Sequence, residues 1–182
     1  MKKIILGQFF LIVCCVFYLV WWYRGYRPGV NAQRTSGING ILLLITAAFG
    51  LLGAFLSAGP ASILSKPRMD PAMIIIAGIF AYIVLLLITK VIFHRVVTAE
   101  LLLITAWTVL ELSVINTLNA AGGLPDKRFY IMFAVIIAAF IISMILYVAY
   151  YRMEEMKAFY AAMVPLVTES AAMAILIGMV KN

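Results

Sequence analysis

Six long apolar runs constrain the fold of this chain more than any other feature. Short links rich in proline, glycine and charged residues separate them. The runs cover residues 4–23, 38–58, 72–93, 97–119, 129–151 and 158–180. A helix needs about 20 consecutive apolar residues to cross a bilayer. We therefore predict an all-α membrane protein, a six-transmembrane-helix bundle in which residues 1–182 form a single polytopic membrane domain.

The composition supports this prediction. Of the 182 residues, 66% are hydrophobic and 12% are charged, whereas soluble domains are about 45–50% apolar and about 25% charged. A globular domain with one membrane anchor is therefore excluded. The first run follows two lysines, as in a signal peptide, but it is too long for one and no small-residue cleavage site follows it. We predict a multi-pass protein of the cell membrane, with membrane lipids as its surroundings.

The net charge of +7 does not indicate nucleic-acid binding, because the cations lie between apolar runs and form no basic stripe. With six spans, the cations divide evenly between the two ends of the bundle. One end has Lys2, Lys3, Lys66, Arg68, Lys127, Arg128 and Lys181, and the other has Arg24, Arg27, Arg34, Lys90, Arg95, Arg152 and Lys157. Orientation usually follows an excess of cations on the cytoplasmic side, so this sequence leaves the orientation open.

Short links at 94–96 and 152–157 predict antiparallel hairpins of the third and fourth runs and of the fifth and sixth. The segment "LLLITA" occurs at 42–47 and again at 101–106. Each odd-numbered run ends in aromatic residues and arginine, as "WWYR", "IFHR" and "AYYR". These features suggest three related helical hairpins, although an apolar alphabet also repeats by chance.

The second run carries small residues at helical spacing, namely Ala47, Gly50, Ala54 and Ser57. Small residues let helix backbones approach closely in lipid. We expect this face to pack inside the bundle or at a subunit interface, in a homo-oligomer or a larger membrane complex.

Two carboxylates interrupt apolar runs near their midpoints, Glu111 in the fourth and Glu169 in the sixth. A charged side chain at the bilayer centre costs about 2.5–3.5 kcal/mol. Because even-numbered runs cross in the same direction, the two glutamates should lie at similar depth. We predict a polar site for a proton, a cation or a cationic group of a substrate, with Thr108, Asn116 and Thr168 beside it. The alternative is that each glutamate is protonated and only hydrogen-bonds a neighbouring helix.

A second polar cluster lies at the link between the third and fourth runs. It contains Lys90, His94, Arg95 and Glu100. One interpretation is interfacial cations with Glu100 capping the fourth helix. The other is an anion site for a lipid headgroup or a substrate phosphate or carboxylate.

Motifs of known enzymes are absent: the sequence has no G-x-S-x-G, H-E-x-x-H or Walker loop. A single histidine and two adjacent cysteines, Cys14 and Cys15, give no ligand spacing for a metal. We therefore expect no cofactor and no metal site, and the sequence favours a protein that is not an enzyme.

The function that this pattern favours is a small transporter, a channel or the membrane subunit of a transport complex, acting on a small molecule or ion. The first alternative is a lipid-processing membrane enzyme that uses His94, Arg95 and Glu100 at the interface. The second is a non-catalytic assembly subunit of a membrane complex. No nucleic-acid partner is expected.

Overall fold

Helices form where the sequence has its apolar runs. A computed structural model describes residues 1–28, 36–58, 67–92, 94, 99–150 and 152–180, and no strand occurs in these ranges. The helices are α1 (Lys2–Tyr26), α2 (Ser36–Ala58), α3 (Pro71–Leu87), a π-helical turn η3 (Ile88–Ile92), α4 (Ala99–Ala120), α5 (Asp126–Tyr150), α6 (Glu155–Ala161) and α7 (Val164–Met179).

Six of these helical stretches are long and apolar enough to cross a membrane. Five are α1, α2, α3 with its π turn, α4 and α5, and the sixth combines α6 and α7. The prediction of an all-helical chain is confirmed, and the six apolar runs each correspond to one such stretch. Their ends differ from the predicted ones by a few residues, which is usual because helix ends are the least certain part of a sequence-based assignment.

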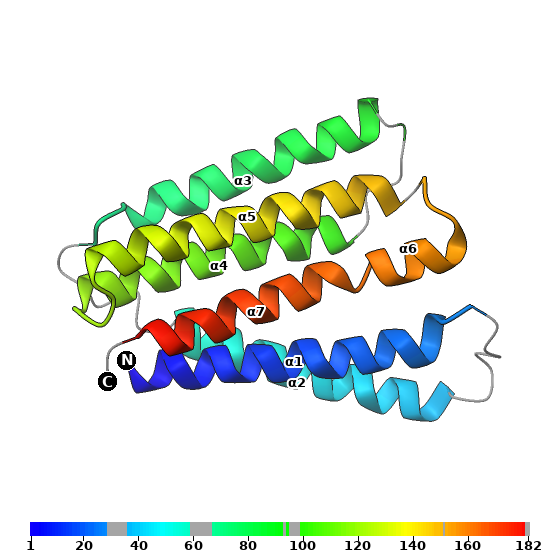
Figure 1. Cartoon of the computed structure of the whole chain (residues 1–182), viewed down its shortest axis with the longest axis horizontal. Helices are drawn as coiled ribbons and strands as arrows, with labels where there is room; N and C mark the ends of the chain where they lie inside the picture. Colours follow the sequence, from blue (N-terminus) through cyan, green and yellow to red (C-terminus); the bar gives the residue numbers. More distant parts are fainter. Residues whose placement is uncertain (29–35, 59–66, 93, 95–98, 151, 181–182) are drawn as a thin grey trace.

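Successive stretches pack as antiparallel hairpins, with α1 against α2, α3 against α4, and α5 against α7 (Figure 1). In addition, α4 contacts α2 and α5, and α7 contacts α1. The two termini lie at the same end of the molecule, and α2, α4 and α7 run in the same direction (Figure 1). Helix α4 is the most buried of the six stretches and α3 the least.

The apolar core lies between α1, α4, α5 and α7. Its fully enclosed side chains include Ile4, Ile115, Met132 and Leu176, one from each of these helices. Outward faces remain apolar, and α2 and α3 expose many large aliphatic and aromatic side chains. A soluble monomer rarely exposes contiguous apolar surface on this scale, whereas lipid is a suitable environment for it.

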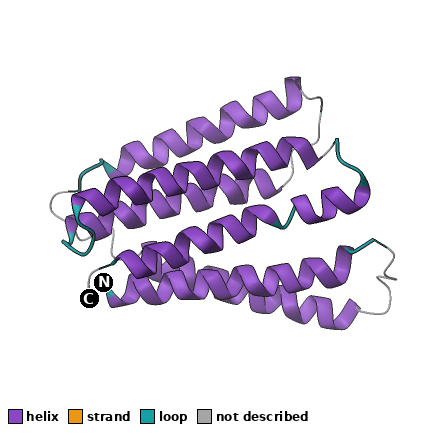
Figure 2. Cartoon of the chain, in the orientation of Figure 1, coloured by secondary structure: helices purple, strands orange, loops and turns teal. Residues whose placement is uncertain are grey.

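The last apolar run is broken at Ala162 and Met163, which separate α6 from α7 (Figure 2). The amide of Met163 donates to the carbonyl of Tyr160 at 3.0 Å, which closes a tight turn of four residues. Pro165 lies in the first turn of α7. Because proline has no N–H and its ring clashes with the preceding turn, it favours the start of a helix and breaks a continuous one.

Helices α1 and α2 cross with their backbones in close contact at two glycines. A Cβ atom added to Gly7 would lie 2.8 Å from the amide nitrogen of Ser57 and 2.9 Å from the carbonyl oxygen of Gly53. A Cβ atom added to Gly53 would lie 2.9 Å from the carbonyl oxygen of Gly7. Of the predicted small-residue face, Ser57 lies at this crossing. Ala47 is exposed, and the contact within the bundle runs through Gly53.

Candidate functional site

Glu111 lies in the interior of the bundle and does not face outward. It is in the middle of α4 and only 1% of its surface is exposed. The amide nitrogen Nε2 of Gln8, on α1, donates a hydrogen bond of 2.9 Å to Glu111 Oε1. The same nitrogen lies 3.4 Å from Ser57 Oγ on α2. Three helices therefore meet at this carboxyl group, and Gln8 connects them.

Glu169, on α7, is also buried, with 7% of its surface exposed. It lies within electrostatic range of Glu111. Helix α5 packs against both α4 and α7, and α1 joins them from the other side, because it packs on α7 and reaches α4 through Gln8. The Cys15 thiol of α1 contacts the side chain of Ser170 and lies within range of both carboxyl groups. The two glutamates thus share one interior region, lined by α1.

Neither glutamate has a cationic partner among the described residues, where the ion pairs are Arg68–Asp126 and Lys157–Glu154. No group of three His, Cys, Asp or Glu side chains suited to a metal ion occurs in that part of the chain. The buried polar atoms of the described region that have no hydrogen-bond partner include Gln8 Oε1 and Trp107 Nε1. Trp107 is one turn before Glu111 on α4, so polar capacity is left unused close to the carboxyl groups.

The predicted neighbours of the glutamates are mostly engaged by their own helices. Thr108 donates to the carbonyl of Ile104 at 2.9 Å, and Thr168 donates to that of Pro165 at 2.8 Å. Thr108 is buried and Thr168 is half-buried. Both hydroxyls keep free lone pairs, because a hydroxyl that donates one bond can still accept.

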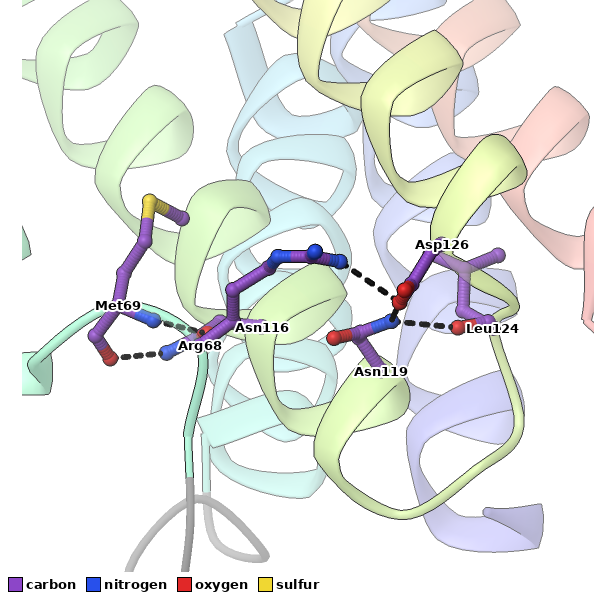
Figure 3. Close-up of polar contacts among 6 residues, drawn as sticks. All are labelled: Arg68, Met69, Asn116, Asn119, Leu124 and Asp126. Carbon is purple, nitrogen blue, oxygen red and sulfur yellow. Dashed lines mark hydrogen bonds and ion pairs between the residues drawn. The ribbon is translucent and has the colours of Figure 1, made fainter.

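Asn116 has a different partner from the one that the sequence suggests. Its Nδ2 donates to the carbonyl of Met69 at 2.7 Å, and its Oδ1 accepts from the amide of Met69 at 2.9 Å (Figure 3). The adjacent Arg68 pairs with Asp126 at 2.6 Å. Both hydrogen-bonding groups of the Asn116 side chain therefore hold the segment that leads into α3.

We expect Asn116→Val to destabilise the protein, because it leaves the N–H and C=O of Met69 unpaired. Each such loss costs about 1–3 kcal/mol when the group is buried. Asp126→Asn removes the exposed ion pair with Arg68 and the charge of the oxygen that accepts from Asn119 at 3.1 Å, and it should cost much less. Thermal unfolding in detergent compares the two variants. Equal unfolding temperatures would show that the Asn116 contact does not anchor the segment.

The second predicted cluster is only partly described. Lys90 lies on the π turn and is exposed, and His94 is exposed with a backbone φ of 47°. Glu100, in the first turn of α4, is also exposed and forms no ion pair with a described cation. Arg95 lies outside the described residues. The π turn was not predicted from the sequence.

A cavity of about 520 Å³ lies between α3 and α4. Its walls are mostly apolar, and Gly78, Tyr82, Thr105 and Asn116 contribute to them. Neither Glu111 nor Glu169 lines it.

Gln8 is the contact residue that the sequence interpretation missed. A polar amide within "IILGQFFLIVCC" is the same kind of signal as a glutamate within an apolar run, and attention to ionisable residues alone passes over it. Comparison with protein-family models, with curated proteins and with solved structures finds no match to this chain.

Proposed function

We propose that this chain is a multi-pass protein of the cell membrane, a small transporter, channel or membrane subunit of a transport complex, in which Glu111 and Glu169 bind a proton or a small cation. The observation that supports it most is the burial of both carboxyl groups in one interior region, without a cationic partner among the described residues. Ionisable residues inside a membrane bundle are costly and are usually functional.

A proton is the ligand that fits the surroundings best. Two ionised carboxylates that are buried within electrostatic range repel each other and lose hydration. A proton on one of them removes that cost with no added volume. The enclosed position of Glu111, beneath Gln8, leaves little room for a larger substrate group. The 2.9 Å hydrogen bond from Gln8 Nε2 supplies a polar partner for Glu111 when it carries the remaining charge.

Chemical labelling tests this proposal without knowledge of a substrate. Dicyclohexylcarbodiimide is an apolar reagent that reacts with protonated carboxyl groups. We expect mass spectrometry of the protein in lipid nanodiscs to show modification at Glu111 or Glu169, decreasing as the pH rises. Glu155 is exposed on α6 and serves as an internal control that stays unmodified.

Added sodium or potassium distinguishes the two ligands. If a cation competes for the site, it slows the modification at constant pH, and if only a proton binds, it does not. Modification of Glu155 to the same extent as the two buried glutamates, or of none of the three at any pH, would contradict the proposal.

A further inference from the structure

Gln8 is placed to respond to the charge of Glu111. Its side chain is 1% exposed, and its Nε2 donates to Glu111 Oε1 at 2.9 Å and lies 3.4 Å from Ser57 Oγ. Its Oε1 has no partner in the described structure. The amide is therefore oriented with both donors used and its acceptor unused.

This orientation suits one protonation state of Glu111. An ionised carboxylate only accepts hydrogen bonds, so it needs the N–H of Gln8. A protonated carboxyl group gains an O–H donor. A half-turn of the Gln8 amide then brings Oε1 to the position of Nε2, where it can accept from Glu111. The hydroxyl of Ser57 can donate or accept, so it can pair with either orientation.

The amide lies beside the closest contact of α1 and α2. Gly7 precedes Gln8, and its backbone packs against Gly53 and Ser57. There is no slack at this crossing, because any added Cβ atom would meet backbone atoms within 3 Å. The Gln8–Ser57 hydrogen bond therefore lies beside the tightest part of this crossing.

Few other titratable groups face Glu111. Those within its electrostatic range are Glu169 on α7 and Cys15 on α1. The neighbouring α2 contributes the neutral Ser57. The charged residues of α5 and of α3 with its π turn lie at their ends, namely Asp126, Lys127, Arg128 and Lys90. Gln8 is thus the described side chain that hydrogen-bonds to this carboxyl group.

We propose that Gln8 positions the Glu111 carboxyl group and reverses its amide when that group gains or loses a proton, with Ser57 changing from hydrogen-bond acceptor to donor. This inference rests on the proposed function, because it requires Glu111 to exchange a proton. It adds a residue from the first helix to the site.

The test is the pH profile of carbodiimide modification at Glu111, compared between the wild type and variants of Gln8. Gln8→Met keeps the size of the side chain and removes both hydrogen-bonding groups. Since the donor that favours the ionised form is lost, the profile should shift to higher pH, with several-fold more modification at a given pH. Gln8→Asn keeps an amide that is too short to reach, so it should shift the profile as well, and it decides the test if the Met variant does not fold. Ser113→Ala, a change on α4 where the hydroxyl bonds its own helix, is the matched control and should behave like the wild type.

The outcomes separate the two proposals. If Glu111 of the wild type shows no pH-dependent modification, the proposed function fails and the role of Gln8 with it. If the wild type is modified as expected but both Gln8 variants keep its pH profile, the role of Gln8 is overturned and the proposed function stands.

Discussion

A chain that combines Glu111→Gln and Glu169→Gln should keep its fold and lose the proton exchange of its interior. Glutamine has nearly the volume of glutamate and can still hydrogen-bond to Gln8, but it carries no titratable proton. A pH jump applied to the purified protein, followed with an indicator dye, should show uptake by the wild type that the double variant lacks. Each single variant should lack the part of the proton uptake that its own carboxyl group supplies.

Glu155→Gln, a change at an exposed carboxyl group on α6, is the control for this experiment. It removes a proton-binding group from the surface and should leave the proton uptake by the two interior carboxyl groups unchanged. If both glutamates serve only as hydrogen-bond partners of neighbouring helices, Gln would be silent in every assay and Leu would cost at most about a few kcal/mol of stability. Full transport by the double variant, once a substrate is known, would contradict a functional role for the pair.

Gly53→Leu should disrupt the bundle more than any other single change in α2. A side chain at this position meets the carbonyl oxygen of Gly7 at 2.9 Å and the side chain of Leu11 at 2.7 Å, and a backbone atom cannot yield as a flexible side chain does. Overpacking of this kind costs about 1–3 kcal/mol or more. Membrane helices also depend on such close approach for their association.

Two other glycines of the same helix give a graded comparison. Gly50 faces the Cys14 sulfur at 3.1 Å, which can move, so Gly50→Leu should be intermediate. Gly40 has open space around it, so Gly40→Leu should resemble the wild type. Thermal unfolding and size-exclusion chromatography in detergent rank the three leucine variants by stability. A Gly53→Leu protein as stable as Gly40→Leu would show that α1 and α2 do not cross at this glycine.

The helices follow from the sequence because six apolar runs of sufficient length leave few other solutions. Which faces of the helices meet does not follow in the same way. Helix α2 has small residues on most of its circumference, so spacing alone cannot choose between Ala47, which is exposed, and Gly53, which meets Gly7. The choice depends on α1, whose glycine lies 46 positions earlier in the chain.

The candidate site, too, could be predicted from the sequence only in part. Glu111 and Glu169 stand out in a single sequence because charge is rare in apolar runs, and their burial agrees with the expectation that such groups face the interior. Their partner Gln8 lies 103 positions from Glu111, and only the packing of α1 on α4 brings them together. The two hydrogen bonds between Asn116 and Met69 also depend on packing between distant segments, which the sequence pattern does not show.

The break between α6 and α7 divides the last span into two helices that meet at Ala162 and Met163. Helix α6 is held to α1, because Trp22 donates to the carbonyl of Phe159 at 3.3 Å and stacks on its ring. Helix α7 carries Glu169. A tilt of α7 about the break would move Glu169 relative to Glu111 without releasing α6. Spin labels on α4 and α7 would measure such a change in the distance between the two helices.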